Sequence, residues 1–478
     1  MSFMRTALAV ILSLSLVNAA WAQAASELLE KGIYAEETQG DLAAAIRIYE
    51  RISGTADAER ATVAQALLRL GMCYLKSGRK AEATSTFQKL AKEFPDQKAI
   101  VAKIPAQATA LALAPAPWPA EETLVFRAKL PGSPQGGVMV FRVQGADVAG
   151  RSAYRLETYR PGGLYTQVHV DADSFQPIDG KVDMQSVGIR TRSVYSPTGV
   201  EMTRWEKEEP KKQQISFSRA VYDNEEVVQL IRRLPLADGY SAPISVVGIG
   251  AAVVVEVKLE VTGRETVTVP AGTYDAYKVN LGIYMDGRHV QDQKLWYSAD
   301  DHRYPVKMEN VLTLELTEVI DGPRSGNVTL QDAASGVSLS APAGWLLVNA
   351  GGAAGQLHAH VLAPEMTVNG AFHRAPLSKH ETAKTAQQMA EEHVEWGQQK
   401  FKVYAVRGAA ETFEVNGLPA TKLTADYTHP VTGRGMVEHR VFVADQGQRV
   451  TLDFDVEKER WDSVKPALDE IVRSLRLR

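Results

Sequence analysis

The sequence predicts a multi-domain protein of α and β structure: α-helical hairpin repeats, then a mostly antiparallel β half-barrel, then an α+β sandwich. Its 478 residues exceed the length of one typical domain. The apolar residues recur at helical spacing before residue 100, alternate one by one after residue 121, and show both patterns after residue 326. The expected parts are a signal peptide (1–24), helical repeats (25–100), an Ala/Pro linker (101–120), a half-barrel (121–322) and an α+β domain (326–478).

The first residues have the composition of a secretory signal. Arg5 is the single charge before an apolar run from Ala7 to Val17, and small residues follow at Ala20 and Ala22. A positive start, a short apolar run and an Ala-x-Ala site predict export and cleavage. The alternative is a buried N-terminal helix. The sequence therefore predicts a periplasmic or secreted protein without a permanent membrane span, because the run is too short for one.

Composition excludes several classes of protein. The formal net charge of -4 argues against a nucleic-acid partner, which requires a basic surface. Cys73 is the only cysteine, so no internal disulfide can form and packed cores must provide the stability. Its place inside an apolar helix predicts a buried structural thiol.

The helical part contains an internal repeat. The segment Gly40–Ala45 matches Gly78–Ala83 at its glycine and alanine positions, and the aromatic residues Tyr49 and Phe87 follow at the same offset. Matched segments at a fixed offset indicate stacked helical hairpins.

The second copy resembles a tetratricopeptide repeat. The first copy departs from the pattern, with Gly32 and Ile33 where Leu and Gly are expected. The resemblance implies antiparallel helices that touch at small residues and offer a groove to protein partners. The residues that match the pattern are Leu67, Leu70, Gly71, Tyr74, Gly78, Ala83, Phe87 and Pro95.

The middle part reads as short strands around one helix. Residues 252–261 and 310–319 alternate between apolar and polar, which is typical of antiparallel strands with one buried face. Only Asn224 to Arg233 has a helical pattern. Strands around one helix predict a curved, barrel-like sheet. The prolines from Ala110 to Ala120 predict a semi-extended linker before it.

This region resembles the domain of unknown function 3108 family of Gram-negative envelope proteins. The resemblance implies a shape similar to the open half-barrels of lipoprotein carriers, and it brings no catalytic residue. The matching pieces are Val221-Tyr-Asp223, Arg232-Arg-Leu-Pro-Leu236, Gly239, Glu265–Val279, Leu295-Trp-Tyr-Ser298 and Tyr304-Pro-Val-Lys-Met308.

The last part has strands between two helices, which predicts an α+β unit. We expect helices over 378–401 and 460–477, with hairpins over 411–427 and 436–456 between them. The strand at 337–345 runs into Pro-Ala-Gly-Trp. This order resembles the PsbP-like fold of photosystem extrinsic proteins and their bacterial relatives, which implies a compact binding domain and no shared chemistry.

Sequence motifs for enzymes and cofactors are missing. The chain has no Gly-x-Ser-x-Gly, no phosphate loop and no dinucleotide fingerprint, so we expect no enzyme and no cofactor. His358 and His360 would share one face of a strand, and His373, His380 and His393 could complete a set around a metal ion. The alternative is that His358 and His360 are two polar positions on a solvent-facing strand. We base the prediction of no metal site on this alternative.

Aromatic residues of the half-barrel are the candidate ligand-binding residues. Tyr154, Trp205 and Trp296, together with Tyr159 and Tyr165, could line an apolar cavity for a lipid tail or a hydrophobic peptide. The alternative is that they fill the hollow as ordinary core.

Three functions remain open on the sequence. The first is a cell-envelope scaffold that binds proteins through its helical repeats. The second is a periplasmic carrier of a lipid or other hydrophobic ligand in the half-barrel. The third is an enzyme whose site has no local signature. A half-barrel that is packed shut favours the scaffold, and a hollow one favours the carrier.

Overall fold

The structure is a computed structural model that describes residues 25–478 except 56–57, 102, 106–110, 130–135, 207–208, 218, 250–251, 353–354, 367, 378–381 and 446. The predicted signal peptide therefore lies outside the described residues. By its internal contacts the chain divides into two compact units. One is the N-terminal part up to Leu113 with the short segments Ser196–Val200 and Ile215–Val221, and the other holds the remaining residues.

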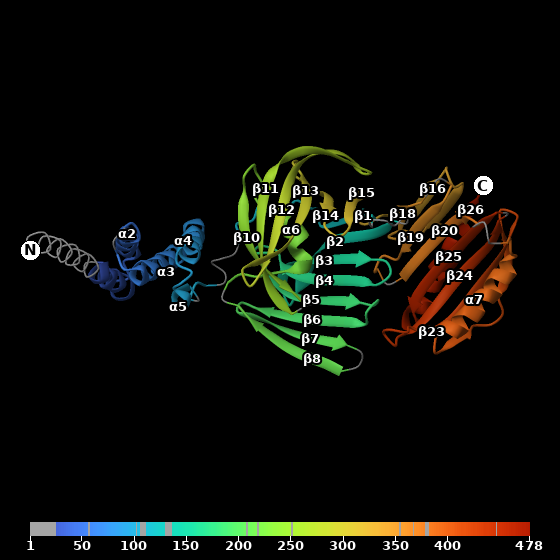
Figure 1. Cartoon of the computed structure of the whole chain (residues 1–478), viewed down its shortest axis with the longest axis horizontal. Coiled ribbons are helices and arrows are strands. Elements are labelled where there is room, and N and C mark those ends of the chain that lie inside the picture. The colour runs from blue at the N-terminus through green and yellow to red at the C-terminus, as the bar shows by residue number, and fades with distance from the viewer. Residues whose placement is uncertain are drawn as a thin grey trace, which may run out of the picture. The chain divides into compact units, whose positions relative to one another are not determined.

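The N-terminal part is helical, as predicted (Figure 1). Residues 25–33 are helical and continue without a break into a π-helix. Cys73 is fully buried, as predicted, and burial raises the pKa of its thiol to about 11. The elements that follow are η1 (Tyr34–Thr38, the π-helix), α2 (Leu42–Ser53), α3 (Arg60–Lys76), α4 (Lys80–Glu93) and α5 (Lys98–Val101).

The two repeats pack by the same contact, but their registers differ by one residue. A Cβ on Gly71 would lie 2.5 Å from the Phe87 ring, and a Cβ on Gly32 would lie 2.5 Å from the Tyr49 ring. Gly32, and not Ile33 as the sequence comparison placed it, is therefore the counterpart of Gly71. The π-helix η1 accounts for the shift, because its wider turn accommodates one additional residue.

The middle part is one large sheet, as the alternating pattern predicted. Its strand order is β8-β7-β6-β5-β4-β3-β2-β1-β15-β14-β13-β12-β11-β10-β9. The strands are β1 (Glu121–Lys129), β2 (Gly137–Val148), β3 (Arg151–Arg160), β4 (Leu164–Asp171), β5 (Pro177–Met184), β6 (Ile189–Ser196), β7 (Gly199–Glu206), β8 (Glu209–Ser216), β9 (Tyr222–Asp223), β10 (Ser241–Gly248), β11 (Val253–Val269), β12 (Gly272–Met285), β13 (Arg288–Ser298), β14 (Pro305–Glu309) and β15 (Thr313–Asp321).

The sheet curves around the one predicted helix (Figure 1). A short turn, η3 (Asn224–Glu226), leads into α6 (Val227–Arg232). Leu230 and Ile231 of α6 are fully buried. Tyr297 of β13 is also fully buried, and its hydroxyl donates a hydrogen bond of 3.1 Å to the Val228 carbonyl oxygen of α6. The concave face of the sheet is therefore occupied by the protein's own helix.

Part of the predicted linker packs into this half-barrel. The Ala114 amide donates to the Arg233 carbonyl oxygen at 2.7 Å. Trp118 is 7% exposed, and its ring lies 5.4 Å from that of Tyr154 and 5.9 Å from that of Phe175. The prolines on either side of Trp118 keep the segment extended, as predicted, but the tryptophan anchors it to the sheet.

The C-terminal part is α+β, as predicted. Its strands form a sheet ordered β18-β19-β20-β25-β24-β23-β21, with β22 paired to β23, and a smaller sheet ordered β16-β17-β26. The elements are β16 (Val328–Asp332), β17 (Val337–Ala341), β18 (Leu346–Gly351), β19 (Leu357–Leu362), β20 (Val368–Pro376), α7 (Ala386–Lys400), β21 (Tyr404–Val406), β22 (Glu411–Val415), β23 (Leu418–Thr428), β24 (Gly435–Asp445), β25 (Gln448–Glu457), η4 (Lys458–Arg460), α8 (Trp461–Ser474) and β26 (Arg476–Leu477).

Both helices of this part are shorter than predicted. Helix α7 begins at Ala386, because the Thr385 side chain accepts from the Gln388 amide while the Gln388 side chain accepts from the Thr385 amide. The predicted start at 378 lies among residues that are not described. Helix α8 ends at Ser474, after which the chain extends into β26. The apolar face of α8 packs on the sheet through Leu468, Ile471 and Val472.

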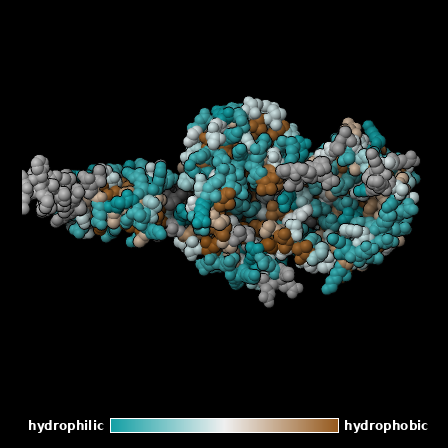
Figure 2. All heavy atoms as spheres, viewed as in Figure 1, coloured by the Kyte–Doolittle hydropathy of each residue, from teal (hydrophilic) through white to brown (hydrophobic). Residues whose placement is uncertain are grey.

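No helix in the described part of the chain is long and apolar enough to cross a membrane. Hydrophilic residues dominate the face of the helical segment seen in Figure 2.

Candidate functional site

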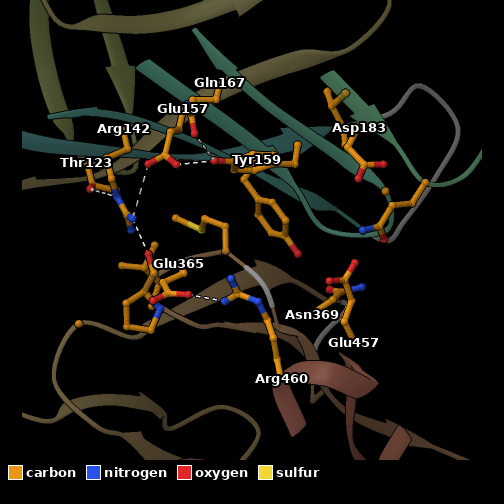
Figure 3. A pocket seen from close by; sticks show the side chains of 18 of the residues that line it. Thr123, Arg142, Glu157, Tyr159, Gln167, Asp183, Glu365, Asn369, Glu457 and Arg460 are labelled. Atoms are coloured by element: carbon orange, nitrogen blue, oxygen red, sulfur yellow. Dashed lines mark hydrogen bonds and ion pairs between the residues drawn. The ribbon is translucent and has the colours of Figure 1, made fainter. Parts of the chain in front are cut away.

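A cavity of about 750 Å³ lies between the half-barrel and the C-terminal part, which belong to the same compact unit. One wall is the outer face of β2 to β5, and the other is built from β20, β23, β24, β25 and the loops beside them. Figure 3 shows Arg142 and Glu157 on the first wall and Glu365 and Arg460 on the second. The size fits a small ligand or a short peptide segment.

The first wall is organised by strand register. Thr123, Arg142, Glu157, Gln167 and Lys181 are directly opposite one another on β1 to β5 and form one polar row. Since side chains alternate along a strand, all five point to the outer face, away from α6. The row therefore presents cationic, anionic and neutral polar groups side by side.

The next row on the same face is partly apolar. It consists of Val125, Val140, Tyr159, Tyr165 and Asp183. The first three pack against β18 and the loop before β20 in one hydrophobic cluster with Leu346, Val348 and Met366. This cluster joins the half-barrel to the C-terminal part, and the polar row beside it is left to line the cavity.

Two arginines connect the two walls of the cavity. The Arg142 guanidinium donates to the Pro364 carbonyl oxygen at 2.5 Å, which links β2 to the loop after β19. Arg434 lies 2.5 Å from Asp183 of the half-barrel and 2.6 Å from Glu457 of β25. These charge-assisted bonds fix the distance between the two walls.

Glu157 is at the centre of the polar row and is largely buried. It accepts a hydrogen bond of 2.5 Å from the Tyr165 hydroxyl, and its second oxygen lies 3.9 Å from Arg142 and 3.8 Å from Arg155. Burial, with the Glu157 charge second, raises the pKa of Tyr165 well above its usual value, so the hydroxyl stays protonated and continues to donate.

A second polar cluster lies inside the half-barrel. Asp223 and Glu226 are fully buried at the start of α6, and the Tyr195 hydroxyl donates to Asp223 at 2.6 Å. Burial raises the pKa of Asp223 to about 7 and raises that of Glu226 as well. These groups hold the turn before α6, because the Asp223 amide donates to Glu226 at 3.0 Å and the Glu225 amide donates to Asp223 at 3.0 Å.

The helical part has a groove of about 520 Å³. Tyr34 of η1 is 55% exposed there, an unusual position for a large aromatic side chain, and Ile48 of α2 is partly exposed beside it. Glu27, Glu30 and Lys31 supply charge along the same groove. An exposed aromatic residue framed by charged ones is typical of a surface that binds another protein.

The three aromatic residues predicted to bind a ligand do not share one cavity. Tyr154 faces the interior and contacts Trp118. Trp296 precedes the inward Tyr297 on β13 and so faces outward, where Lys307 lies 4.8 Å from the centre of its ring. Trp205 lies on β7 with Arg190 of β6 5.7 Å from its ring. Their binding role stays a prediction, and none of them lines the cavity of about 750 Å³.

The predicted histidine pair does share one face. The ring centres of His358 and His360 are 4.7 Å apart, and those of His358 and His373 are 4.3 Å apart. Burial lowers the pKa of His358 to about 4 and that of His360 to about 3, so both are neutral at physiological pH. Within the described residues, no three or more His, Cys, Asp or Glu side chains are arranged to hold a metal ion.

Sequence reasoning named Tyr159 and Tyr165, which line the cavity of about 750 Å³, but missed its charged residues. Arg155 and Glu157 alternate with inward residues on β3, a visible signal of an outer face. Their convergence with Lys181 depends on the pairing of three strands, β3 to β5, which the sequence does not state.

Comparison with known proteins agrees with the sequence resemblances. Residues 134–317 match the family model described as "Protein of unknown function (DUF3108)", and residues 65–96 match the tetratricopeptide repeat. A comparison with curated proteins gives no match.

Several solved structures are similar to parts of the chain. The PsbP protein (CyanoP) of Synechocystis sp. PCC 6803 is 18% identical and covers 32% of this chain and 94% of its own, with a TM-score of 0.25. A beta-barrel-like protein of the DUF1849 family from Brucella abortus is 12% identical, over 44% of this chain and all of its own, with a TM-score of 0.29. MucB, solved in complex with MucA(peri), is 10% identical and covers 75% of this chain and 93% of its own, with a TM-score of 0.17. The chain thus contains a segment that matches the tetratricopeptide repeat and a region that matches the DUF3108 family model.

Proposed function

We propose that this chain is an exported envelope protein that acts as an interaction scaffold and not as an enzyme. The observation that carries the proposal is the groove of the helical part, in which Tyr34 is 55% exposed beside Ile48. The match of residues 65–96 to the tetratricopeptide repeat supports the same use, since such repeats present grooves to protein segments.

The chemistry of the groove suggests the kind of segment that it takes. Tyr34, Ala44 and Ile48 offer an apolar strip, and Glu27 and Glu30 lie along it. A partner segment with an apolar anchor and a basic residue would cover the strip and pair with the glutamates. The groove is large enough for a few side chains, so the partner supplies an extended or helical peptide.

The N-terminal composition supports export. Arg5, the apolar run from Ala7 to Val17 and the small residues near Ala22 predict a cleaved signal, and with such a signal the partner would be in the periplasm or outside the cell. N-terminal sequencing of protein isolated from the periplasm should give a chain that begins at Gln23 or Ala25. A chain that keeps Met1 in the cytoplasm contradicts export.

The carrier alternative requires a hollow half-barrel. Leu230 and Ile231 of α6, Tyr297 and Trp118 occupy the concave face instead. The packing of this face favours the scaffold over a carrier that holds a lipid tail inside the sheet.

Photo-crosslinking in the native cell tests the scaffold function. A photoreactive phenylalanine analogue replaces Tyr34, and the same analogue replaces Lys92, an exposed residue of α4 outside the groove, in the control. We expect one discrete protein adduct from position 34 and none of the same mass from position 92. Lipid adducts, or identical adducts at both positions, contradict the proposal.

A further inference from the structure

Among the described residues that line the cavity between the half-barrel and the C-terminal part, one cation has no hydrogen bond or ion pair. The arginines of the cavity are all bound to acceptors of the protein: Arg142 to Pro364, Arg155 to Gln144, Arg324 to Glu318, Arg434 to Asp183 and Glu457, and Arg460 to Glu365. The Lys181 ammonium has no hydrogen bond or ion pair with any residue that the structure describes. The ammonium lies over the Tyr165 ring, 5.0 Å from its centre.

Charges of both signs lie around Lys181, and the carboxylates among them already have other partners. Asp179 of β5, for example, pairs with His169 at 2.8 Å. Arg192 is directly opposite on β6, and Arg155 lies on the same face of β3. Glu157 is the carboxylate of the same polar row. It already accepts a hydrogen bond from Tyr165 and forms ion pairs with Arg142 and Arg155. Burial lowers the pKa of Lys181, which shows that the protein compensates its desolvation incompletely.

Neutral polar groups border the same space. The side chains of Tyr159, Gln185 and Asn369 line the cavity, and within the described residues none of them makes a side-chain hydrogen bond. A hydroxyl and two amides can each donate to an oxygen atom. An ammonium without an ion pair, in a cavity that is also lined by neutral donors without hydrogen bonds, is an arrangement that an anion completes.

We propose that Lys181 is the anion-binding residue of this cavity and that the ligand carries an oxyanion, either a carboxylate or a phosphate group. The rest of the ligand would lie against Tyr159, Leu346 and Met366, the apolar part of the lining. This inference goes beyond the scaffold function, because it concerns the other unit of the chain and does not require the helical groove to bind anything.

Competitive lysine acylation of the full mature chain, read by mass spectrometry, tests the proposal. The rate of Lys181 modification is measured with increasing inorganic phosphate or malonate, at constant ionic strength maintained with chloride. Lys294 of β13, which is exposed and outside the cavity, is the internal control. We expect at least one anion to slow Lys181 about threefold at twice its Kd while Lys294 is unchanged. Phosphate and malonate distinguish the two sources of the oxyanion.

Thermal shift with variants gives a second readout. The effective anion should raise the Tm of the unmodified protein and of Lys294→Gln, partly that of Lys181→Arg, and not that of Lys181→Gln. Unchanged Lys181 rates with both anions, or equal slowing of both lysines, overturn the assignment. A Tm rise that persists in Lys181→Gln overturns it too, because it places the anion elsewhere. Either outcome leaves the crosslinking result at Tyr34 unaffected.

Discussion

Arg232 of α6 and Glu122 of β1 form an ion pair in which both side chains are completely buried. Two bonds join them: one Arg232 nitrogen lies 2.5 Å from one Glu122 oxygen, and the second nitrogen lies 3.0 Å from the other. The same guanidinium donates to the His302 carbonyl oxygen at 2.9 Å. Arg232 belongs to the segment 232–236, one of the pieces that resemble the DUF3108 family. Its ion pair fixes α6 inside the sheet, which gives this segment a structural role.

Removing one partner of this pair should destabilise the half-barrel strongly. Arg232→Met leaves the Glu122 carboxylate buried without compensation and should cost about 3–5 kcal/mol of unfolding free energy. Arg232→Met combined with Glu122→Leu should recover most of that loss. Urea unfolding measures both. The exposed pair Arg264–Asp275 gives the control, and Arg264→Gln should leave the midpoint unchanged. Equal effects of the buried and exposed changes would contradict the account.

Stability should depend on pH through Asp223 and Glu226. Burial raises the pKa of Asp223 to about 7 in the folded chain, against about 3.9 in an unfolded one. The folded state then holds more protons between these values, so the free energy of unfolding falls as pH rises from about 4 to 7. Asp223→Asn should flatten this dependence while keeping an acceptor for Tyr195. Urea titrations at pH 5 and pH 7.5 compare the two proteins, and a variant with the slope of the parent argues against the buried carboxyl as its source.

Close packing in the helical repeats can be tested at Gly71. Gly71→Ala places a Cβ 2.5 Å from the Phe87 ring, so the helices must separate, at a cost of about 1–3 kcal/mol. Gly54→Ala is the matched control, because its Cβ would meet nothing closer than 3.7 Å. Thermal melts of the full chain should show a lower Tm for the first variant alone. Equal melting temperatures would remove the packing role of Gly71.

The bridge made by Arg434 predicts a link between the two β parts. Arg434→Gln removes its ion pairs with Asp183 and Glu457 and should expose the cavity residues to solvent. Hydrogen exchange should quicken in β5 and at the end of β25, while β11 and β12, which lie away from the cavity, stay unchanged. An equal change of exchange rate in β5 and β25 and in β11 and β12 would show that Arg434 does not link the two β parts.

Local patterns predicted most of the fold. Alternation identified the strands, and the single helical stretch at 224–233 became η3 and α6. The sequence-based predictions failed where a single residue changed the register of a repeat or the first residue of a helix. The π-helix at Tyr34 shifted the first repeat by one position, and the capping residue Thr385 set the start of α7. Both effects depend on backbone hydrogen bonds that apolar spacing does not reveal.

The candidate site was less predictable because it depends on distant pairings. Trp296 and Tyr297 are neighbours in sequence, yet they lie on opposite faces of β13, and only the inward one contacts α6. Lys181, Glu157 and Arg142 are far apart in sequence and meet through the register of β2 to β5. Without that register, the aromatic residues were the stronger signal, and three of them, Tyr154, Trp205 and Trp296, lie in separate places.

Native mass spectrometry of the mature chain, purified gently from its own cell envelope and paired with lipid extraction, tests the central claim most directly. The filled concave face and the helical groove predict a protein partner bound to the chain and no stoichiometric lipid. Addition of a peptide that carries the crosslinked partner sequence should release the partner. A chain that retains one lipid per molecule and no protein partner would contradict the scaffold account and restore the carrier.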